Sequence, residues 1–157
     1  MDIKAINQVL KEQGRVSLKE GGGHRFALIT PEQWDEQHDQ ATGIFLLYDL
    51  FQIRSIAVPF SDVSLDVVEF GNKPIIYHTL ANKTFVVGPF QDGQVKFAMI
   101  REGGWNKLLF NHGKLLIYEA LPADRSVDFE VPDKFPLSGK EVKEMFLGPE
   151  GEVKILS

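Results

Sequence analysis

Apolar residues near the start of the chain recur every three or four positions, which is the spacing of one helix face. The positions are Ile3, Ile6, Val9 and Leu10. Asp2 stands before them as a capping residue, and Gly14 follows at a place where a left-handed residue ends a helix. The pattern predicts a helix between Asp2 and Gly14.

Two short apolar runs follow this helix. Val16 and Leu18 indicate one strand, and residues 26–29 indicate another, with a loop between them at residues 19–24. The sequence Thr30-Pro31-Glu32-Gln33 then combines a capping hydroxyl, a proline suited to the first helical position and a glutamine three residues after the cap. These signals predict a second helix that runs to about Thr42.

Residues 44–60 are almost continuously apolar, so periodicity does not separate a buried helical turn from a strand at residues 44–51. Residues 56–60 favour a strand. Ser61 or Ser64 can then begin a helix that Gly71 ends.

The second half of the chain carries mostly strand signals. β-branched, aromatic or alternating runs at residues 75–77, 95–99 and 114–118 predict strands, and residues 127–131 predict an edge strand in a proline-rich connector. The remaining signals predict a short helix around Trp105, Leu108 and Leu109, a brief helical turn at residues 138–141, and a closing hairpin of residues 145–147 with 153–155.

Strands and helices alternate for most of the length, but the Asp92-Gly93 turn and the closing hairpin also require antiparallel pairs. We therefore predict an α+β (mixed α/β) fold, with a mixed sheet flanked by helices. Residues 1–157 contain no internal repeat and no long linker, which indicates a single domain.

The composition excludes several classes of protein. With 43% hydrophobic and 25% charged residues, the chain has the proportions of a globular domain, and the absence of cysteine excludes disulfide frameworks and thiolate zinc sites. The net charge of −5 means that contact with nucleic acid requires a local basic patch. No apolar run approaches the roughly 18 residues that span a bilayer, and the N-terminus is unlike a signal sequence, so we expect a cytoplasmic protein without a membrane partner.

Three segments occur in the order found in YrdC/YciO/YwlC-type domains, the family of threonylcarbamoyl-AMP synthases and putative translation factors. They are residues 72–76, residues 92–100 followed by a short helix and residues 113–117, and residues 147–155. The resemblance implies a twisted mixed parallel/antiparallel sheet that closes with a C-terminal β-hairpin and has a concave, nucleotide-binding face. It also implies activities to test, because many members make threonylcarbamoyl-adenylate from threonine, bicarbonate and ATP for tRNA modification, and some bind tRNA or double-stranded RNA.

The residues that carry this chemistry in the family are replaced here. Residues 19–24 stand where the family has a Pro-Thr-Asp-Thr-like segment, and only Arg54 matches its Lys-x-Arg signature. A family arginine aligns with Ala98, and the Ser-Thr-Ser-Ala-Asn run aligns with residues 118–122. Because an adenylating enzyme needs donors for a polyphosphate, the resemblance implies a diverged domain without catalytic residues, a pseudoenzyme.

Several cationic residues remain as candidates for binding a nucleotide or RNA. The loop Gly21-Gly22-Gly23 beside Arg25 is either an anion-binding nest or a flexible hairpin loop. Trp105, close to Arg101, either stacks on a base or anchors its helix on the sheet. The complete candidate set is Lys19, His24, Arg25, Arg54, Lys73 and Arg101.

We predict no metal site, because Asp35 and His38 share a helix face but are too few ligands to define one. Three hypotheses for the function remain. The first is a non-catalytic YrdC-like domain that binds a nucleotide, structured RNA or a protein partner on its concave face. The second is an active synthase that uses ATP and Mg²⁺ and has relocated its phosphate-binding groups to Lys19, Arg25, Arg54 or Arg101. The third is a protein-interaction module of unrelated role.

Overall fold

The computed structural model describes residues 1–35, 38, 42–84 and 86–157. It begins with the predicted helix α1 (Ile3–Gln13), which the Asp2 side chain caps by accepting a hydrogen bond from the Ala5 N–H at 3.0 Å. Gly14 ends the helix with φ 72°, a left-handed conformation that glycine adopts without steric cost. Ile6 and Leu10 are its buried residues, so the apolar spacing of the sequence marks the face that packs.

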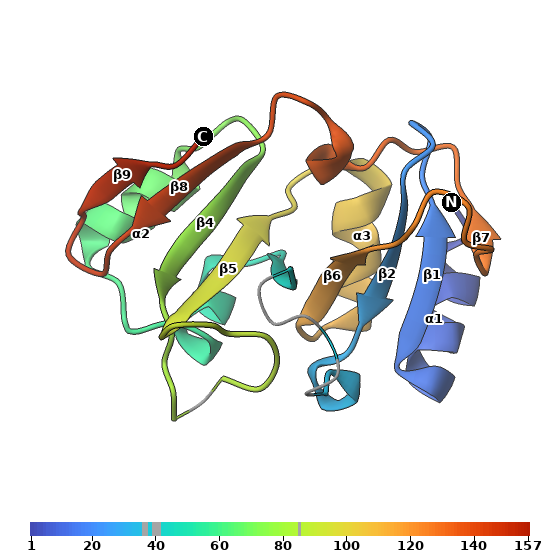
Figure 1. Ribbon diagram of the computed structural model, residues 1–157, viewed down its shortest axis with the longest axis horizontal. Helices are drawn as coiled ribbons and strands as arrows, with labels where there is room; N and C mark the ends of the chain where they lie inside the picture. The colour runs from blue at the N-terminus through green and yellow to red at the C-terminus, as the bar shows by residue number, and fades with distance from the viewer. Residues whose placement is uncertain (36–37, 39–41, 85) are drawn as a thin grey trace.

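The described residues form one mixed nine-stranded sheet with the order β7-β1-β2-β6-β3-β5-β4-β8-β9 (Figure 1). The strands are β1 (Arg15–Lys19), β2 (Arg25–Ile29), β3 (Ile44–Leu47), β4 (Ile75–Leu80), β5 (Gln94–Met99), β6 (Leu116–Ala120), β7 (Phe129–Glu130), β8 (Lys143–Leu147) and β9 (Val153–Ile155). Three neighbouring pairs are parallel, namely β1 with β7, β3 with β5, and β4 with β8. The others are antiparallel, and β8 with β9 is the predicted C-terminal hairpin.

Helices cover both faces of this sheet. On one face, α1 and α3 (Gly103–His112) pack over β1, β2, β6 and β3, and their buried residues join one core (Figure 1). On the other face, the 3₁₀ helix η2 (Leu50–Ser55) and α2 (Asp62–Glu69) contribute Ile53 and Val68 to a second core. The predicted mixed sheet flanked by helices is therefore confirmed.

The second predicted helix is wrong in the part that the structure describes. Thr30 and Pro31 begin only one 3₁₀ turn, η1 (Pro31–Gln33), and the Thr30 side chain makes no capping hydrogen bond. Trp34 is already extended, with φ −76° and ψ 126°, because its side chain turns into the second core. Residues 36–37 and 39–41 of the predicted helix lie outside the described residues.

The strand predicted at residues 56–60 is also wrong. The ambiguous apolar run resolves into β3 and then η2, because Asp49 and Gln52 form a capping box that begins a helical turn. The N–H groups of Ile56 and Ala57 both donate to the Ile53 carbonyl, and Ala57 makes only an isolated bridge with Ala81. Local capping thus prevails over the β-branched residues that favoured a strand.

The helical turn predicted at residues 138–141 lies earlier, at η3 (Pro136–Ser138). Pro136 takes the first turn of η3, and Gly139 is extended with φ −77° and ψ 155°. Proline is preset for an initial helical position, which explains why the turn begins there.

Candidate functional site

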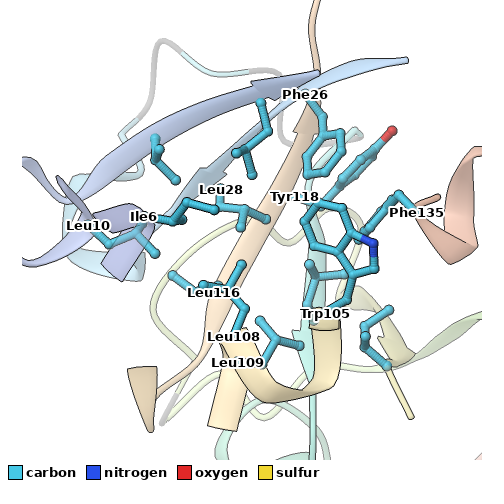
Figure 2. Close-up of a cluster of buried hydrophobic side chains, with 14 of the residues drawn as sticks. Ile6, Leu10, Phe26, Leu28, Trp105, Leu108, Leu109, Leu116, Tyr118 and Phe135 are labelled. Carbon is cyan, nitrogen blue, oxygen red and sulfur yellow. The ribbon is translucent and has the colours of Figure 1, made fainter. Parts of the chain in front are cut away.

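Four aromatic side chains from distant parts of the chain pack against one another, some stacked and some tilted or edge-on. They are Phe26 of β2, Trp105 of α3, Tyr118 of β6 and Phe135 of the connector before η3 (Figure 2). The ring centroids of Phe26 and Phe135 are 4.4 Å apart, and the rings of Tyr118 and Phe135 are nearly parallel at 5.5 Å. Trp105 donates from Nε1 to the Lys134 carbonyl at 2.9 Å, so it anchors α3 and the connector together.

By the resemblance in the sequence, one member of this aromatic cluster and one other core residue occupy positions that carry polar groups in the family. Tyr118 aligns with the first residue of the family's hydroxyl run, and Ala98 aligns with a family arginine. Here Tyr118 is 7% exposed, Ala98 is 1% exposed, and both belong to the core that contains the aromatic cluster. The side chains at these two positions are packed inside the protein and do not face solvent.

The Tyr118 hydroxyl lies at the edge of the aromatic cluster, 2.5 Å from Nε2 of His24. Burial, reinforced by the negative charge of Glu20, raises the pKa of Tyr118 to about 12. The hydroxyl is therefore protonated at neutral pH and acts as a hydrogen-bonding group, and His24 stacks on the rings of Phe26 and Tyr118.

The glycine-rich loop joins β1 and β2 as a hairpin, and the protein's own groups use its amides. Gly23 N–H donates to the Glu20 carbonyl, and Gly21 N–H donates to the Asp133 carbonyl at 2.9 Å. The Glu20 side chain is 3% exposed and accepts hydrogen bonds from the backbone N–H groups of His24, at 3.1 Å, and Phe135, at 2.9 Å. The buried carboxyl group of Glu20 thus lies in the loop that the sequence offered as a possible binding site for an anion.

Of the other candidate cations, Lys19 and Arg25 are cross-strand partners in the β1–β2 pair, and Arg54 lies in η2. Lys19 faces Glu130 across the β1–β7 pair, with Nζ and Oε1 3.9 Å apart. Arg25 donates to the Ala123 carbonyl, and Arg54 lies over the Phe51 ring with 5.5 Å between its Cζ and the ring centroid. These contacts give each of the three cations a local partner.

Lys73 and Arg101, in contrast, line one hollow of about 290 Å³. The antiparallel pairing of β4 and β5 brings them together, because Lys73 precedes β4 and Arg101 follows β5. Lys134 of the connector also lines the hollow, and Glu102 is the acidic side chain among the described lining residues. Phe135, Pro136, Ile75 and Met99 supply apolar surface.

The floor of this hollow contains Tyr77, whose side chain is 3% exposed. Within the described part of the chain its hydroxyl has no hydrogen-bond partner, and a Cβ at Gly71 would come within 3.0 Å of it. Burial raises the pKa of Tyr77, and the nearby positive charge of Arg101 opposes that effect. Arg101 itself donates to the Val68 carbonyl at the end of α2. The hollow therefore combines positive charge with the hydroxyl group of a largely buried tyrosine.

Sequence reasoning identified Lys73 and Arg101 but missed Tyr77, Lys134 and Glu20. Tyr77 read as an ordinary strand residue and Lys134 as part of a polar connector, because nothing local indicates that the connector folds back over β5. An acid next to three glycines was the available signal for Glu20, since a loop carboxylate can accept hydrogen bonds from nearby amides.

The described residues contain no group of three or more metal-ligating side chains that could hold an ion. His38 lies 2.9 Å from Asp35, between Nδ1 and Oδ1, and stacks on Trp34. Among the helices of the described ranges, none has both the length and the apolar character needed to cross a bilayer.

Comparison with known proteins gives matches by structure alone. No family model matches the sequence, and no curated protein matches it either. The similar solved structures include three that contain related domains. Full-length HypF in its phosphate- and nucleotide-bound form has a TM-score of 0.68 at 9% identity, and a variant of P. abyssi Sua5 has 0.70 at 12%. E. coli YciO has a TM-score of 0.66 at 12% identity.

The matches cover almost all of this chain, namely 99%, 98% and 99%. They cover 28% of HypF, 52% of Sua5 and 89% of YciO, so the chain spans about a quarter of the first protein and half of the second. These neighbours all contain YrdC-type domains. The chain therefore has the YrdC-type fold that its scaffold segments predicted.

Proposed function

We propose that the protein is a non-catalytic YrdC-like domain that binds a phosphate-bearing ligand, either a nucleotide or structured RNA such as tRNA or double-stranded RNA. The binding surface is the concave hollow lined by Lys73, Arg101 and Lys134. The observation that carries the proposal is the convergence of these three cations, against one glutamate, in a protein of net charge −5.

The chemistry of the hollow suits a phosphate group. Lysine ammonium and arginine guanidinium groups make charge-assisted hydrogen bonds to phosphate oxygens, and these bonds are shorter and stronger than neutral ones. The Tyr77 hydroxyl can add a donor from the floor of the hollow, where burial reduces competition with water. Phe135 and Pro136 offer an apolar wall against which the rest of a ligand can pack.

The absence of catalysis is proposed from the aromatic cluster. Phe26, Tyr118 and Phe135 fill space next to the positions that align with the family's hydroxyls. Loss of one donor that stabilises a transition state typically costs about a hundredfold or more in rate, so several such losses leave no useful synthase activity. The domain keeps cations that bind but lacks the donors that an adenylation step requires.

The test is a binding titration of the purified protein with ATP, AMP and tRNA at low salt. We expect saturable binding of at least one of them, and the charge reversal Lys73→Glu with Lys134→Glu should weaken it by about tenfold or more. Among the residues that the structure describes, neither lysine side chain takes part in a hydrogen bond or an ion pair. The matched control is Lys140→Glu with Lys143→Glu, two exposed lysines outside the hollow.

This control should bind like the unmodified protein. Equal affinity of the Lys73 and Lys134 variant would contradict the assigned surface. Failure of all three ligands to bind would contradict the proposed function and leave the hypothesis of a protein-interaction module.

A further inference from the structure

The strand β9 (Val153–Ile155) lies at one edge of the sheet, with α2 behind it (Figure 1). It pairs with β8 on one side, and no strand of the described residues lies on its other side. An exposed edge strand presents a row of unpaired N–H and C=O groups, which is a template for pairing with another chain. The sheet can therefore be extended at β9.

The free backbone groups of this edge belong to Val153 and Ile155. The Gly148 N–H donates to the Glu152 carbonyl across the β8–β9 pair. Hydrogen-bonded positions alternate along an antiparallel pair, so the next residue whose backbone groups face β8 is Lys154. The N–H and C=O groups of Val153 and Ile155 consequently point away from β8, toward the open side of the strand.

The side chains of Val153 and Ile155 are exposed on the face of the sheet that α2 covers. Val153 lies opposite Leu147, which belongs to the second core, so both side chains project to the face of that core. Val153 is 49% exposed, Ile155 is 65% exposed, and Val63 of α2 is 60% exposed. A Cβ at Gly151 would come within 2.8 Å of the Val63 side chain. The edge thus has an apolar strip beside a residue without a side chain.

The other face of this edge carries one acid and one base, Glu152 and Lys154. Both are exposed, and neither takes part in an ion pair among the residues that the structure describes. The Glu152 carboxylate lies beside Gly148, and a change of rotamer is enough to turn it toward the open side. A lysine alone would repel the same lysine of a second copy, whereas this acid makes the edge complementary to itself.

One antiparallel register uses this complementarity. With a two-fold axis at Val153, Lys154 of each copy lies opposite Glu152 of the other, so two pairs of opposite charges form. An axis at Lys154 would instead place the two lysines directly opposite each other, which is destabilising. The charges therefore select the register centred on Val153.

We propose that β9 pairs antiparallel with β9 of a second copy of this chain, about a two-fold axis at Val153. The Val153 N–H of each copy donates to the Val153 carbonyl of the other. Ile155 of each copy lies over Gly151 of the other and packs against Val63 there, which removes exposed apolar surface from water. The interface is isologous, because both copies contribute the same patch. It uses no residue that lines the hollow of the proposed function, so the two proposals are independent.

The test is sedimentation velocity of the full chain over a range of protein concentrations. We expect a reversible equilibrium between monomer and dimer that shifts toward the dimer as the concentration rises, because an interface of one short strand and a few side chains is small. A chain that is still monomeric at about 1 mM would overturn the proposal.

Charge variants test the register. Lys154→Glu and Glu152→Lys should each weaken self-association by about tenfold or more, because each places like charges opposite one another. An equal mixture of the two variants should dimerise like the unmodified chain, since the acids of one copy then face the lysines of the other. The matched control is Lys140→Glu with Glu141→Lys, which exchanges two exposed charges away from β9 and should not change the association. Unchanged association in the single variants, or no dimer in their mixture, would overturn the proposal.

Val153→Pro tests the strand pairing itself. Because the Val153 N–H points away from β8, proline removes a donor to the second copy and none to β8. We expect the dimer to be lost while the circular dichroism spectrum stays unchanged. Ile155→Asp is a second variant at an exposed position, and it should weaken the association by about tenfold or more even if the proline variant does not fold. Unchanged dimerisation in a folded form of either variant would contradict the proposed interface.

Discussion

The backbone N–H of Phe135 donates to the carboxyl group of Glu20 at 2.9 Å, although the two residues are 115 positions apart in the chain. This hydrogen bond joins the β1–β2 hairpin loop to the connector that carries Phe135 into the aromatic cluster. Gly21 reinforces the junction, because its N–H donates to Asp133 and an added Cβ would come within 2.1 Å of the Pro132 carbonyl oxygen. The loop and the aromatic filling are therefore parts of one structural unit.

Replacement of Glu20 by alanine should destabilise the protein. The change leaves the N–H groups of His24 and Phe135 without their acceptor, and each loss costs about 1 to 3 kcal/mol, so we expect the free energy of unfolding to fall by about 2 to 6 kcal/mol. Urea denaturation followed by circular dichroism measures this. Glu20→Gln keeps one acceptor oxygen and should cost less, whereas an unchanged midpoint in the alanine variant would show that the carboxyl group is dispensable.

Truncation of Phe135 should open a cavity in the aromatic cluster. Phe135 is 3% exposed and touches three other rings, so Phe135→Ala should cost about 3 to 5 kcal/mol. Chemical denaturation gives the loss, and the near-ultraviolet signal of Trp105 should weaken. The control is Phe70→Ala, because Phe70 is 76% exposed and its truncation should change stability by less than about 0.5 kcal/mol. Similar losses in the two variants would contradict the packing described here.

Ser64 should contribute to stability through one buried hydrogen bond. Its side chain is fully buried, and Oγ donates to the Gly148 carbonyl at 2.7 Å, which ties α2 to the turn between β8 and β9. Ser64→Ala removes this donor and should cost about 1 to 3 kcal/mol in thermal or urea unfolding. Ser126→Ala at an exposed position is the matched control and should have no measurable effect. A neutral Ser64→Ala would mean that the carbonyl finds another partner.

Alkaline titration should reveal the buried hydroxyl of Tyr118. Its pKa is about 12 in the folded protein against 10.0 for the unperturbed side chain, so the folded state holds this proton more tightly than the unfolded state. The contribution to stability is complete below pH 10 and is lost as the pH rises through about 12. Absorbance of the phenolate should show a late transition that Tyr118→Phe removes, in addition to that of Tyr77, whose pKa burial also raises. The difference between the titration curves of the unmodified protein and the Tyr118→Phe variant isolates Tyr118. A transition near pH 10.0 in this difference would contradict the burial of the hydroxyl.

The extent to which the sequence predicted this structure depends on how local the signals are. The helix between Asp2 and Gly14 is confirmed because its cap, its apolar face and its left-handed end all lie within one segment. The helix predicted after Thr30 is wrong because Trp34 gains more from burial in the second core than from continuing the turn. The strand predicted at residues 56–60 is also wrong, because the Asp49 capping box begins η2 just before it.

In the candidate site, too, the sequence predicted what depends on local signals and missed what depends on tertiary packing. The sequence singled out Lys73 and Arg101 only as candidate cations, and the structure brings them together because they flank β4 and β5, which pair antiparallel. Tyr77 and Lys134 could not be selected from the sequence, because their place in the hollow depends on how the connector packs against β5 and α3. The packing of Phe135 in the aromatic cluster is likewise a tertiary contact, and no periodic pattern in the sequence predicts it.

The most direct test of the account is to measure pyrophosphate release from ATP in the presence of threonine and bicarbonate, with an active synthase run in parallel. We expect no release above the background without protein, under conditions in which a nucleotide or tRNA still binds to the Lys73 and Arg101 hollow. Release that depends on both threonine and bicarbonate would contradict it, because the aromatic cluster would then leave room for the adenylation reaction.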